Sequence, residues 1–248
     1  RTDGSSKVGA NNKWAFFPSA SVAWVASQEG FMKDFEMINN LKLRAGYGLA
    51  GNQDAISSYN SLSLMSPNGT TTVNGLPVVT MGVTRNYNPD LKWEATQQYN
   101  FGVDFGILNG ALSGSFDYFL KYTKGMLYEP PYIGAIGEGG YRWINAADMS
   151  NNGFDLILTY SGKVNQDFSY SITGNLSSFK NKIDNLPESA RYAYGGNGLD
   201  DDILGRPLHS HYGFVADGLF KTSEEVDNSP EQAGKAVGRI RYKDLDHD

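Results

Sequence analysis

A glycine-rich segment is the first candidate for chemistry in this sequence. Gly46–Gly51 matches the G-x-G-x-x-G pattern with which dinucleotide-binding folds approach a pyrophosphate. Such a site also needs a helix directly after the glycines, with its N-terminus facing the phosphates. The next residues, Asn52–Asp54, start no apolar helical period, so glycines alternating along a strand explain the pattern better. We therefore reject a nucleotide site.

Acidic and histidine residues near the C-terminal end form a second candidate. Asp244, Asp246 and Asp248 have the D-x-D-x-D spacing of the first three ligand positions in a calcium loop. The glycine and the glutamate that complete such a loop would have to follow Asp248, so a solvated acidic turn is favoured. His209 and His211 would need further ligands to hold a metal, and no such ligands stand out. Calcium at the aspartates is thus the one cofactor that the sequence suggests.

Carboxylates at alternating polar positions are a third candidate. Glu94, Asp104 and Asp117 could provide a pair of acids of the kind used in glycoside hydrolysis. They share those positions with Lys92 and Lys121, which favours solvated wall residues over a catalytic pair. No Ser-His-Asp order and no metalloprotease signature accompanies them. The sequence therefore predicts that this protein is not an enzyme.

The elements that would position these side chains are β-strands. From Leu91 to Ile107 apolar and polar residues alternate, and Gln97 is the only polar residue on the apolar side. Successive side chains of a strand point to opposite faces, so this segment has one apolar and one polar face. It is longer than the usual soluble strand of about 5–6 residues. A strand that is apolar outside and charged inside is typical of a membrane barrel.

A tight turn predicts how this strand pairs with the next. Asn109–Gly110 is the strongest short signal for a two-residue type I′ turn. With that turn, Ile107 faces Leu112, and about six pairs match apolar with apolar or polar with polar, whereas a one-residue slip would mix both faces. Phe119, on the polar side opposite Asn100, is the exception. The sequence therefore predicts a hairpin with this register.

The chain as a whole is predicted to be all-β, an antiparallel transmembrane β-barrel segment with long extracellular loops. Short connections alternate with long ones, as periplasmic turns alternate with outside loops in such barrels. Barrel hairpins with their intervening loops would cover residues 1–183, and a large extracellular loop region residues 184–248. The predicted strands are Ala15–Ala26, Leu41–Leu49, Leu91–Ile107, Ala111–Lys124, Asn152–Tyr160 and Phe168–Ser178.

Composition narrows the class of protein further. A net charge of −6 without a basic cluster argues against a nucleic-acid partner. The absence of cysteine argues against a disulfide scaffold and thiol chemistry. No apolar run approaches the length of about 18 residues that a transmembrane helix needs. This does not exclude a membrane barrel, because only every second residue of a barrel strand is apolar. A large soluble β-sandwich is the alternative that the pattern alone leaves open.

Aromatic residues in the predicted loops are candidates for binding. Flat rings on exposed loops suit stacking against sugars or packing against a protein lid. Packing of the loops onto one another is an equally good interpretation. The candidates for substrate or lid contacts are Tyr132, Tyr141, Trp143, Tyr192 and Tyr194.

Several segments, in order along nearly the whole chain, resemble one family. Leu41–Gly48 with Gly51–Gln53 is similar to the most recognisable barrel stretch of the SusC/RagA-type TonB-dependent outer-membrane transporters of Bacteroidetes. The other matching segments are Arg1–Ser6, Phe16–Ser19, Asn88–Glu94, Asn152–Asp155, Tyr212–Phe220 and Ile240–Asp244.

This resemblance implies about six strands of a 22-stranded barrel, from the C-terminal half of the protein, with a plug domain that is absent from this chain. It implies TonB-dependent import of a glycan or a peptide across the cell outer membrane, with a SusD-like surface lipoprotein as lid and TonB-ExbB-ExbD acting through the plug. The polar lumen would hold Arg44, Glu94, Asp104, Asp117 and Lys121, while lipid would contact the apolar face. The stretch that resembles the family's large extracellular loop adds Tyr212, Phe214 and Phe220 as candidate lid contacts.

Two rival functions stay open. A siderophore or cobalamin TonB-dependent receptor would share the barrel but lack the lipoprotein lid. A secreted β-rich glycan-binding or adhesive protein would be soluble without detergent and would need no plug.

Overall fold

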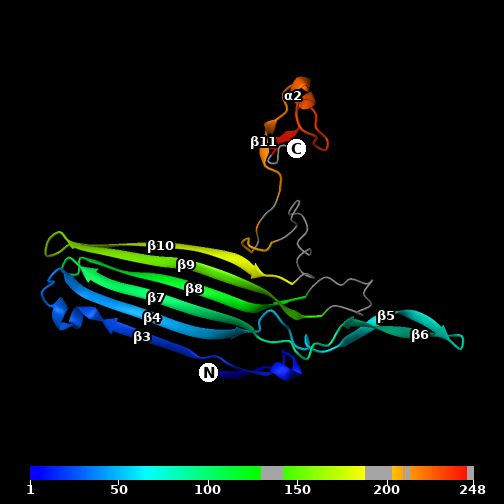
Figure 1. The fold of residues 1–248 in the computed structure, drawn as a ribbon, viewed down its shortest axis with the longest axis horizontal. Coiled ribbons are helices and arrows are strands. Elements are labelled where there is room, and N and C mark those ends of the chain that lie inside the picture. Colours follow the sequence, from blue (N-terminus) through cyan, green and yellow to red (C-terminus); the bar gives the residue numbers. More distant parts are fainter. Residues whose placement is uncertain (130–141, 188–202, 209, 211–212, 245–248) are drawn as a thin grey trace.

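The computed structural model describes residues 1–129, 142–187, 203–208, 210 and 213–244. Its main body is a six-stranded antiparallel sheet with the strand order β10-β9-β8-β7-β4-β3. The strands lie side by side, with the short connections at one end and the long ones at the other (Figure 1). They are β3 (Ser19–Val25), β4 (Ile38–Asn52), β7 (Glu94–Ile107), β8 (Leu112–Tyr128), β9 (Ile144–Lys163) and β10 (Ser169–Asn185).

Smaller elements accompany this sheet. Three two-stranded sheets in the described part pair β1 (Thr2–Gly4) with β2 (Trp14–Phe16), β5 (Leu64–Val73) with β6 (Leu76–Arg85), and β11 (Ala216–Leu219) with β12 (Ile240–Tyr242). The helical elements are η1 (Ala10–Asn12), η2 (Ala26–Gln28), η3 (Gly30–Met32) and α2 (Ser223–Asp227). In the described ranges, no helix has the length and apolar content needed to span a membrane.

The predicted register of the central hairpin is confirmed. β7 and β8 pair over 13 residues, from Ile107↔Leu112 to Ala95↔Lys124. Phe119 lies opposite Asn100, as the sequence predicted. The turn itself covers Leu108–Ala111, because the Gly110 N–H donates to the Ile107 carbonyl and the Ala111 N–H donates to the Leu108 carbonyl, both at 3.1 Å. Leu108 thus shares the left-handed backbone of the turn, with φ 56°.

Several predicted strand boundaries were wrong. The first strand is interrupted after β2, where Pro18 has no N–H to donate and only its carbonyl accepts from Leu49, at 2.9 Å. β7 begins at Glu94, because Leu91 is buried in a small cluster with Val8 and Ile56 and does not pair with a strand. β9 starts at Ile144 instead of Asn152, and β10 continues past Ser178 to Asn185.

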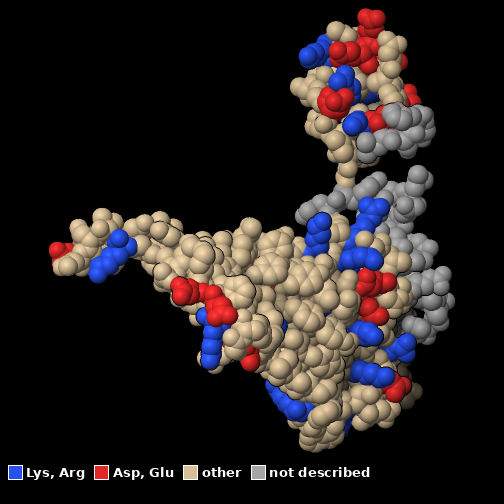
Figure 2. All heavy atoms as spheres, turned by 60° about the vertical axis from the view of Figure 1, so that its left-hand side comes forward, with Lys and Arg blue, Asp and Glu red and all other residues tan. Residues whose placement is uncertain are grey.

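One face of the main sheet carries a continuous apolar band. Rows of paired residues cross the strands, such as Leu43, Val103, Phe116, Leu156 and Leu176. Many of these side chains are exposed, among them Phe101 at 52 % and Leu176 at 56 %. The face in Figure 2 has a broad uncharged centre, with Lys, Arg, Asp and Glu side chains at its margins.

The apolar band has a limited height. On β7 it runs from Ile107 to Tyr99, eight residue steps that span about 27 Å along the strand. A tilt of about 35–45° reduces this to about 20 Å, close to the apolar band of about 25 Å in outer-membrane barrels. Above it the same face becomes polar, with Asn152 on β9 and Lys180 on β10 opposite each other.

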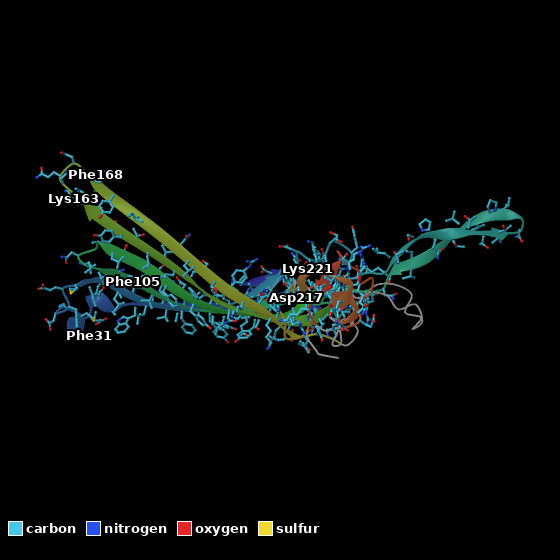
Figure 3. The ribbon with its side chains drawn as sticks, turned by 90° about the horizontal axis from the view of Figure 1, so that it is seen from above. Phe31, Phe105, Lys163, Phe168, Asp217 and Lys221 are labelled. Carbon is cyan, nitrogen blue, oxygen red and sulfur yellow. The ribbon has the colours of Figure 1, made fainter. Side chains whose placement is uncertain are left out.

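Aromatic residues gather at the short-turn end of this band. The Tyr160 and Tyr170 rings lie 6.1 Å apart, and those of Trp24 and Phe31 lie 6.2 Å apart. Seen from above, the sheet is curved, and Phe31, Phe105 and Phe168 lie at the same end (Figure 3). Aromatic residues therefore rim the apolar band at this end, as they do in outer-membrane barrels.

A small core closes the opposite end of the sheet. Val8, Ile56 and Leu91 are at most 1 % exposed and pack together, with Trp93, Leu127 and Trp143 against them. Trp93 also contacts Phe17 edge-on, with ring centroids 5.7 Å apart. Trp93 thus helps to fix the connections Ala50–Asp90 and Gly125–Asn151 to the sheet.

The connection Ala50–Asp90 contains a hairpin that the sequence analysis missed. β5 and β6 are joined at Asn74–Gly75, which have φ 51° and 78° as a type I′ turn requires. The hairpin projects beyond the end of the main sheet (Figure 1). The Asn-Gly signal and the valines after it were present in the sequence and would have identified it.

The two faces predict opposite responses to an added charge. We expect Phe116→Arg in the full-length protein to lower the free energy of unfolding by at least about 2–4 kcal/mol, because the guanidinium would enter the apolar band. Ser115→Arg, one residue earlier on the polar face, is the matched control and should stay within about 1 kcal/mol of wild type. Urea titration of the protein in lipid vesicles measures both, and equal losses would contradict the assignment of faces.

Candidate functional site

An arginine on the polar face joins three strands. Arg44 on β4 donates from Nη2 to Asp104 Oδ1 on β7 at 2.7 Å, and from Nε to Oδ2 of the same carboxylate at 3.0 Å. It also donates from Nη1 and Nη2 to the two oxygens of Asp117 on β8, at 2.8 and 2.9 Å. Lys42 Nζ lies 3.8 Å from Asp104. Three of the predicted lumen residues thus form one ion-paired cluster.

A glycine between the two carboxylates makes room for this cluster. Gly102 pairs with Arg44 on one side and Asp117 on the other. A Cβ placed on Gly102 would lie 2.5 Å from Asp117 Oδ1 and 2.6 Å from Arg44 Cζ. The guanidinium therefore lies across the glycine, a planar fork that binds both carboxylates at once.

The other two predicted lumen residues lie elsewhere on the sheet. Glu94, at the start of β7, accepts from Asn52 Nδ2 at 3.2 Å and from the Leu127 N–H at 3.3 Å. It therefore holds the ends of β4 and β8 together at the long-loop end. Lys121 on β8 has its ammonium 4.9 Å from the centre of the Phe119 ring, a cation–π contact.

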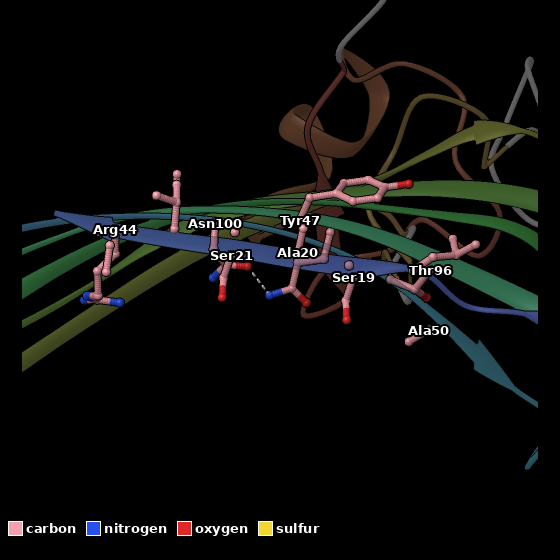
Figure 4. Close-up of a pocket in the computed structure, with 16 residues that line it drawn as sticks. Ser19, Ala20, Ser21, Arg44, Tyr47, Ala50, Thr96 and Asn100 are labelled. Carbon is pink, nitrogen blue, oxygen red and sulfur yellow. Dashed lines mark hydrogen bonds between the residues drawn. The ribbon is translucent and has the colours of Figure 1, made fainter. Parts of the chain in front are cut away.

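Small residues next to the ion-paired cluster leave a hollow of about 830 Å³. Its lining includes Ser19 and Ser21 on β3, Gly46 and Gly48 on β4, and the hydrogen-bonded side chains of Gln98 and Asn100 on β7. In Figure 4 the Arg44 and Ser19 side chains lie on one side of the β3 ribbon and the Tyr47 ring on the other. Gly46 and Gly48 of the dinucleotide pattern thus line an open sheet surface, whereas Gly51 lies under the Phe17 ring, and no helix follows them.

The described loop aromatics have different roles from those predicted. Trp143 packs against the small core, and its carbonyl accepts from Asn88 Nδ2 at 2.6 Å, so it anchors a loop instead of presenting a free ring. Phe220 is 1 % exposed, which corrects its interpretation as a lid contact. Phe214 is 83 % exposed and stacks on Tyr242, with ring centroids 4.8 Å apart. Of Trp143, Phe214 and Phe220, Phe214 is the one with a ring exposed enough to contact another protein.

Other candidates lie outside the described residues. They are Tyr132, Tyr141, Tyr192, Tyr194, His209, His211, Tyr212, Asp246 and Asp248. Asp244 is described, but in that part of the chain no group of three or more His, Cys, Asp or Glu side chains could hold a metal ion. Calcium at Asp244, Asp246 and Asp248 therefore stays a prediction.

A comparison with known families decides what this sheet belongs to. A family model described as "TonB dependent receptor-like, beta-barrel" matches residues 1–247. The chain belongs to the β-barrel family of TonB-dependent receptors. The predicted resemblance is thus confirmed, and the six strands are a segment of a receptor β-barrel, with an apolar band on one face and the Arg44 cluster on the other.

Curated relatives of this TonB-dependent receptor segment come from Bacteroidetes. It is 35 % identical over 258 residues to TonB-dependent receptor P3 of Formosa agariphila, covering 99 % of this chain and 25 % of the relative. It is 29 % identical over 239 residues to TonB-dependent receptor SusC of Bacteroides thetaiotaomicron, covering 92 % of this chain and 23 % of the relative. The chain thus spans about a quarter of the length of the curated relatives it matches.

Solved structures show the same fold. The RagAB peptide transporter matches with a TM-score of 0.74 and 28 % identity, over 89 % of this chain and 24 % of that one. The RagAB peptide importer in its "closed-closed" state matches with a TM-score of 0.75 and 26 % identity, over 98 % of this chain and 26 % of that one.

The Arg44 cluster predicts how two glycines differ in their tolerance of a methyl group. Gly102→Ala should lower the free energy of unfolding by about 1–3 kcal/mol, because the new Cβ displaces the guanidinium from Asp117. Gly46→Ala is the control, since its Cβ would have no atom within 3.9 Å, and it should be nearly neutral. Urea titration in vesicles compares them.

A second background separates the ion pairs from simple crowding. In an Arg44→Ala protein the guanidinium is already absent, so Gly102→Ala should cost much less than in wild type. An unchanged cost in both backgrounds would contradict this account of the cluster.

Proposed function

We propose that this segment forms part of the wall and outer loops of a transporter in the outer membrane. The full-length protein imports a glycan or a peptide in a TonB-dependent step, together with a SusD-like surface lipoprotein, and catalyses no chemical reaction. The observation that carries the proposal is the six-stranded wall with an apolar band on one face and the Arg44 cluster on the other. Such a wall needs lipid outside and a polar lumen inside.

Physical features of the sheet support transport over a soluble binding protein. The apolar face stays exposed along the strands, with side chains such as Val22, Phe101 and Ile172 at 67, 52 and 65 %. A soluble sandwich would cover that face with a second sheet, and the smaller sheets in the described part have two strands each. Lipid is the partner that fits a tilted, aromatic-rimmed band of this height.

Relatives with named assemblies support the partner. SusC and the RagAB peptide transporter match this chain over 92 and 89 % of its length. In the C-terminal unit, Thr222 caps α2 by accepting from the Glu225 N–H at 3.2 Å. This folded unit presents Phe214 on its surface, which suits contact with the lipoprotein.

The test uses the full-length protein in the bacterium that encodes it, with an affinity tag in place. We expect it to need detergent for extraction and to copurify with a surface lipoprotein. Deletion of its gene should abolish growth on one carbon source from a panel of polysaccharides and casein peptides, and deletion of tonB should do the same.

The controls separate the rival functions. A growth defect that appears only under iron or cobalamin limitation, without a copurifying lipoprotein, would favour a siderophore or cobalamin receptor. Recovery in the soluble fraction, with growth unchanged, would overturn the proposal in favour of a secreted binding protein.

The lid contact has its own expected outcome. Phe214→Ala should weaken copurification of the lipoprotein several-fold, because an exposed aromatic ring is lost from the contact surface. Phe35→Ala, an exposed ring at the short-turn end, is the control and should leave copurification unchanged. Equal recovery of the lipoprotein with both variants would remove Phe214 from the interface.

A further inference from the structure

Two aromatic rings stand on the otherwise polar lumen face. Phe119 on β8 and Phe179 on β10 both pair with Gly153 on β9, one from each side. Phe119 is half-buried, and Phe179 is 63 % exposed. Facing the lumen, the two rings are separate from the outer apolar band, so contact with lipid does not explain them.

Gly153 leaves room for the Phe119 ring. A Cβ on Gly153 would lie 2.8 Å from Phe119 Cζ on one side and 2.7 Å from Phe179 Cβ on the other. The Phe119 ring thus reaches over the glycine, and Phe179 flanks it on the next strand; we call these residues the aromatic platform (Phe119, Gly153 and Phe179). Any larger residue at position 153 would force them apart.

Three asparagine side chains lie near the aromatic platform. Asn100 pairs with Phe119 in the same row and is hydrogen-bonded to Gln98, at the edge of the hollow. In the next row lie Asn151 and Asn181, paired with each other. Amide side chains offer both donors and acceptors, as sugar hydroxyl groups require.

The charges nearest the aromatic platform are already engaged. Asp117 is bound to Arg44, and Asp155 accepts from Ser177 Oγ at 2.6 Å. Lys121 lies over the Phe119 ring.

The height of the aromatic platform suits an incoming substrate. Phe119 lies seven residues beyond Leu112, the first residue of β8, which is about 24 Å along the strand from the short-turn end. The row to which it belongs extends through Asn100 and Gly46 into the hollow. A chain-like ligand could thus contact the rings and the amides together.

We propose that the aromatic platform is a subsite for a neutral oligosaccharide, with a sugar ring stacked on the exposed Phe179 beside Phe119 and its hydroxyl groups bonded to Asn100 and its neighbours. The inference rests on the proposed import function and names its substrate class. Stacking of an apolar sugar face on an aromatic ring supplies the affinity, and the amides supply the orientation.

The test measures binding by the purified full-length protein in detergent with its lipoprotein. The probes are an array of neutral plant, algal and bacterial oligosaccharides, an array of uronate-containing ones and a casein peptide mixture. We expect neutral oligosaccharides to bind, and Phe179→Ala and Phe119→Ala each to reduce their affinity at least tenfold. Phe116→Ala, the same change on the lipid face of β8, should bind like wild type.

Each other outcome overturns the subsite. Binding of peptides or uronates alone would assign a different substrate class, while the import function would stand on its growth and tonB results. Neutral oligosaccharide binding that survives both substitutions would place the subsite elsewhere on the protein. Loss of binding in Phe116→Ala as well would show that the variants act through folding, which circular dichroism of each variant checks.

Discussion

Backbone hydrogen bonding between neighbouring strands is the constraint on which the rest of this structure depends. A strand whose outer side contacts lipid can satisfy its N–H and C=O groups only through the strands beside it. The six strands meet this need over long ladders, up to 16 paired positions between β9 and β10. The same ladders hold each side chain on one face, so they create the apolar band and the polar lumen face together.

Charge on the lumen face reinforces the same ladders. Arg44, Asp104 and Asp117 come from β4, β7 and β8, and their bidentate contacts tie side chains across three strands. Gly102 is needed beneath them because no side chain fits under the guanidinium. The result is a polar face on which one guanidinium is paired with both Asp104 and Asp117.

Glycines on the wall have a second use beside aromatic rings. The Phe105 ring covers Gly114 on the apolar face, and the Phe119 ring covers Gly153 on the polar face. A ring lying on a bare stretch of backbone shields its hydrogen bonds and packs without a neighbouring side chain. On the apolar face, the Phe105 ring fills the space left by Gly114. On the polar face, the Phe119 ring is part of the aromatic platform proposed to bind a sugar.

The sequence by itself determined the faces, the register of β7 with β8 and the family, because a two-residue period and an Asn-Gly turn are local signals. It did not determine where strands end: above the apolar band, residues such as Asn152 and Lys180 lose the alternation while backbone pairing continues. Tertiary structure alone brought Arg44 to Asp104 and Asp117, buried Phe220, and placed Phe179 beside Phe119. Those contacts join residues distant in sequence, and which partners meet depends on how strands are ordered in the sheet.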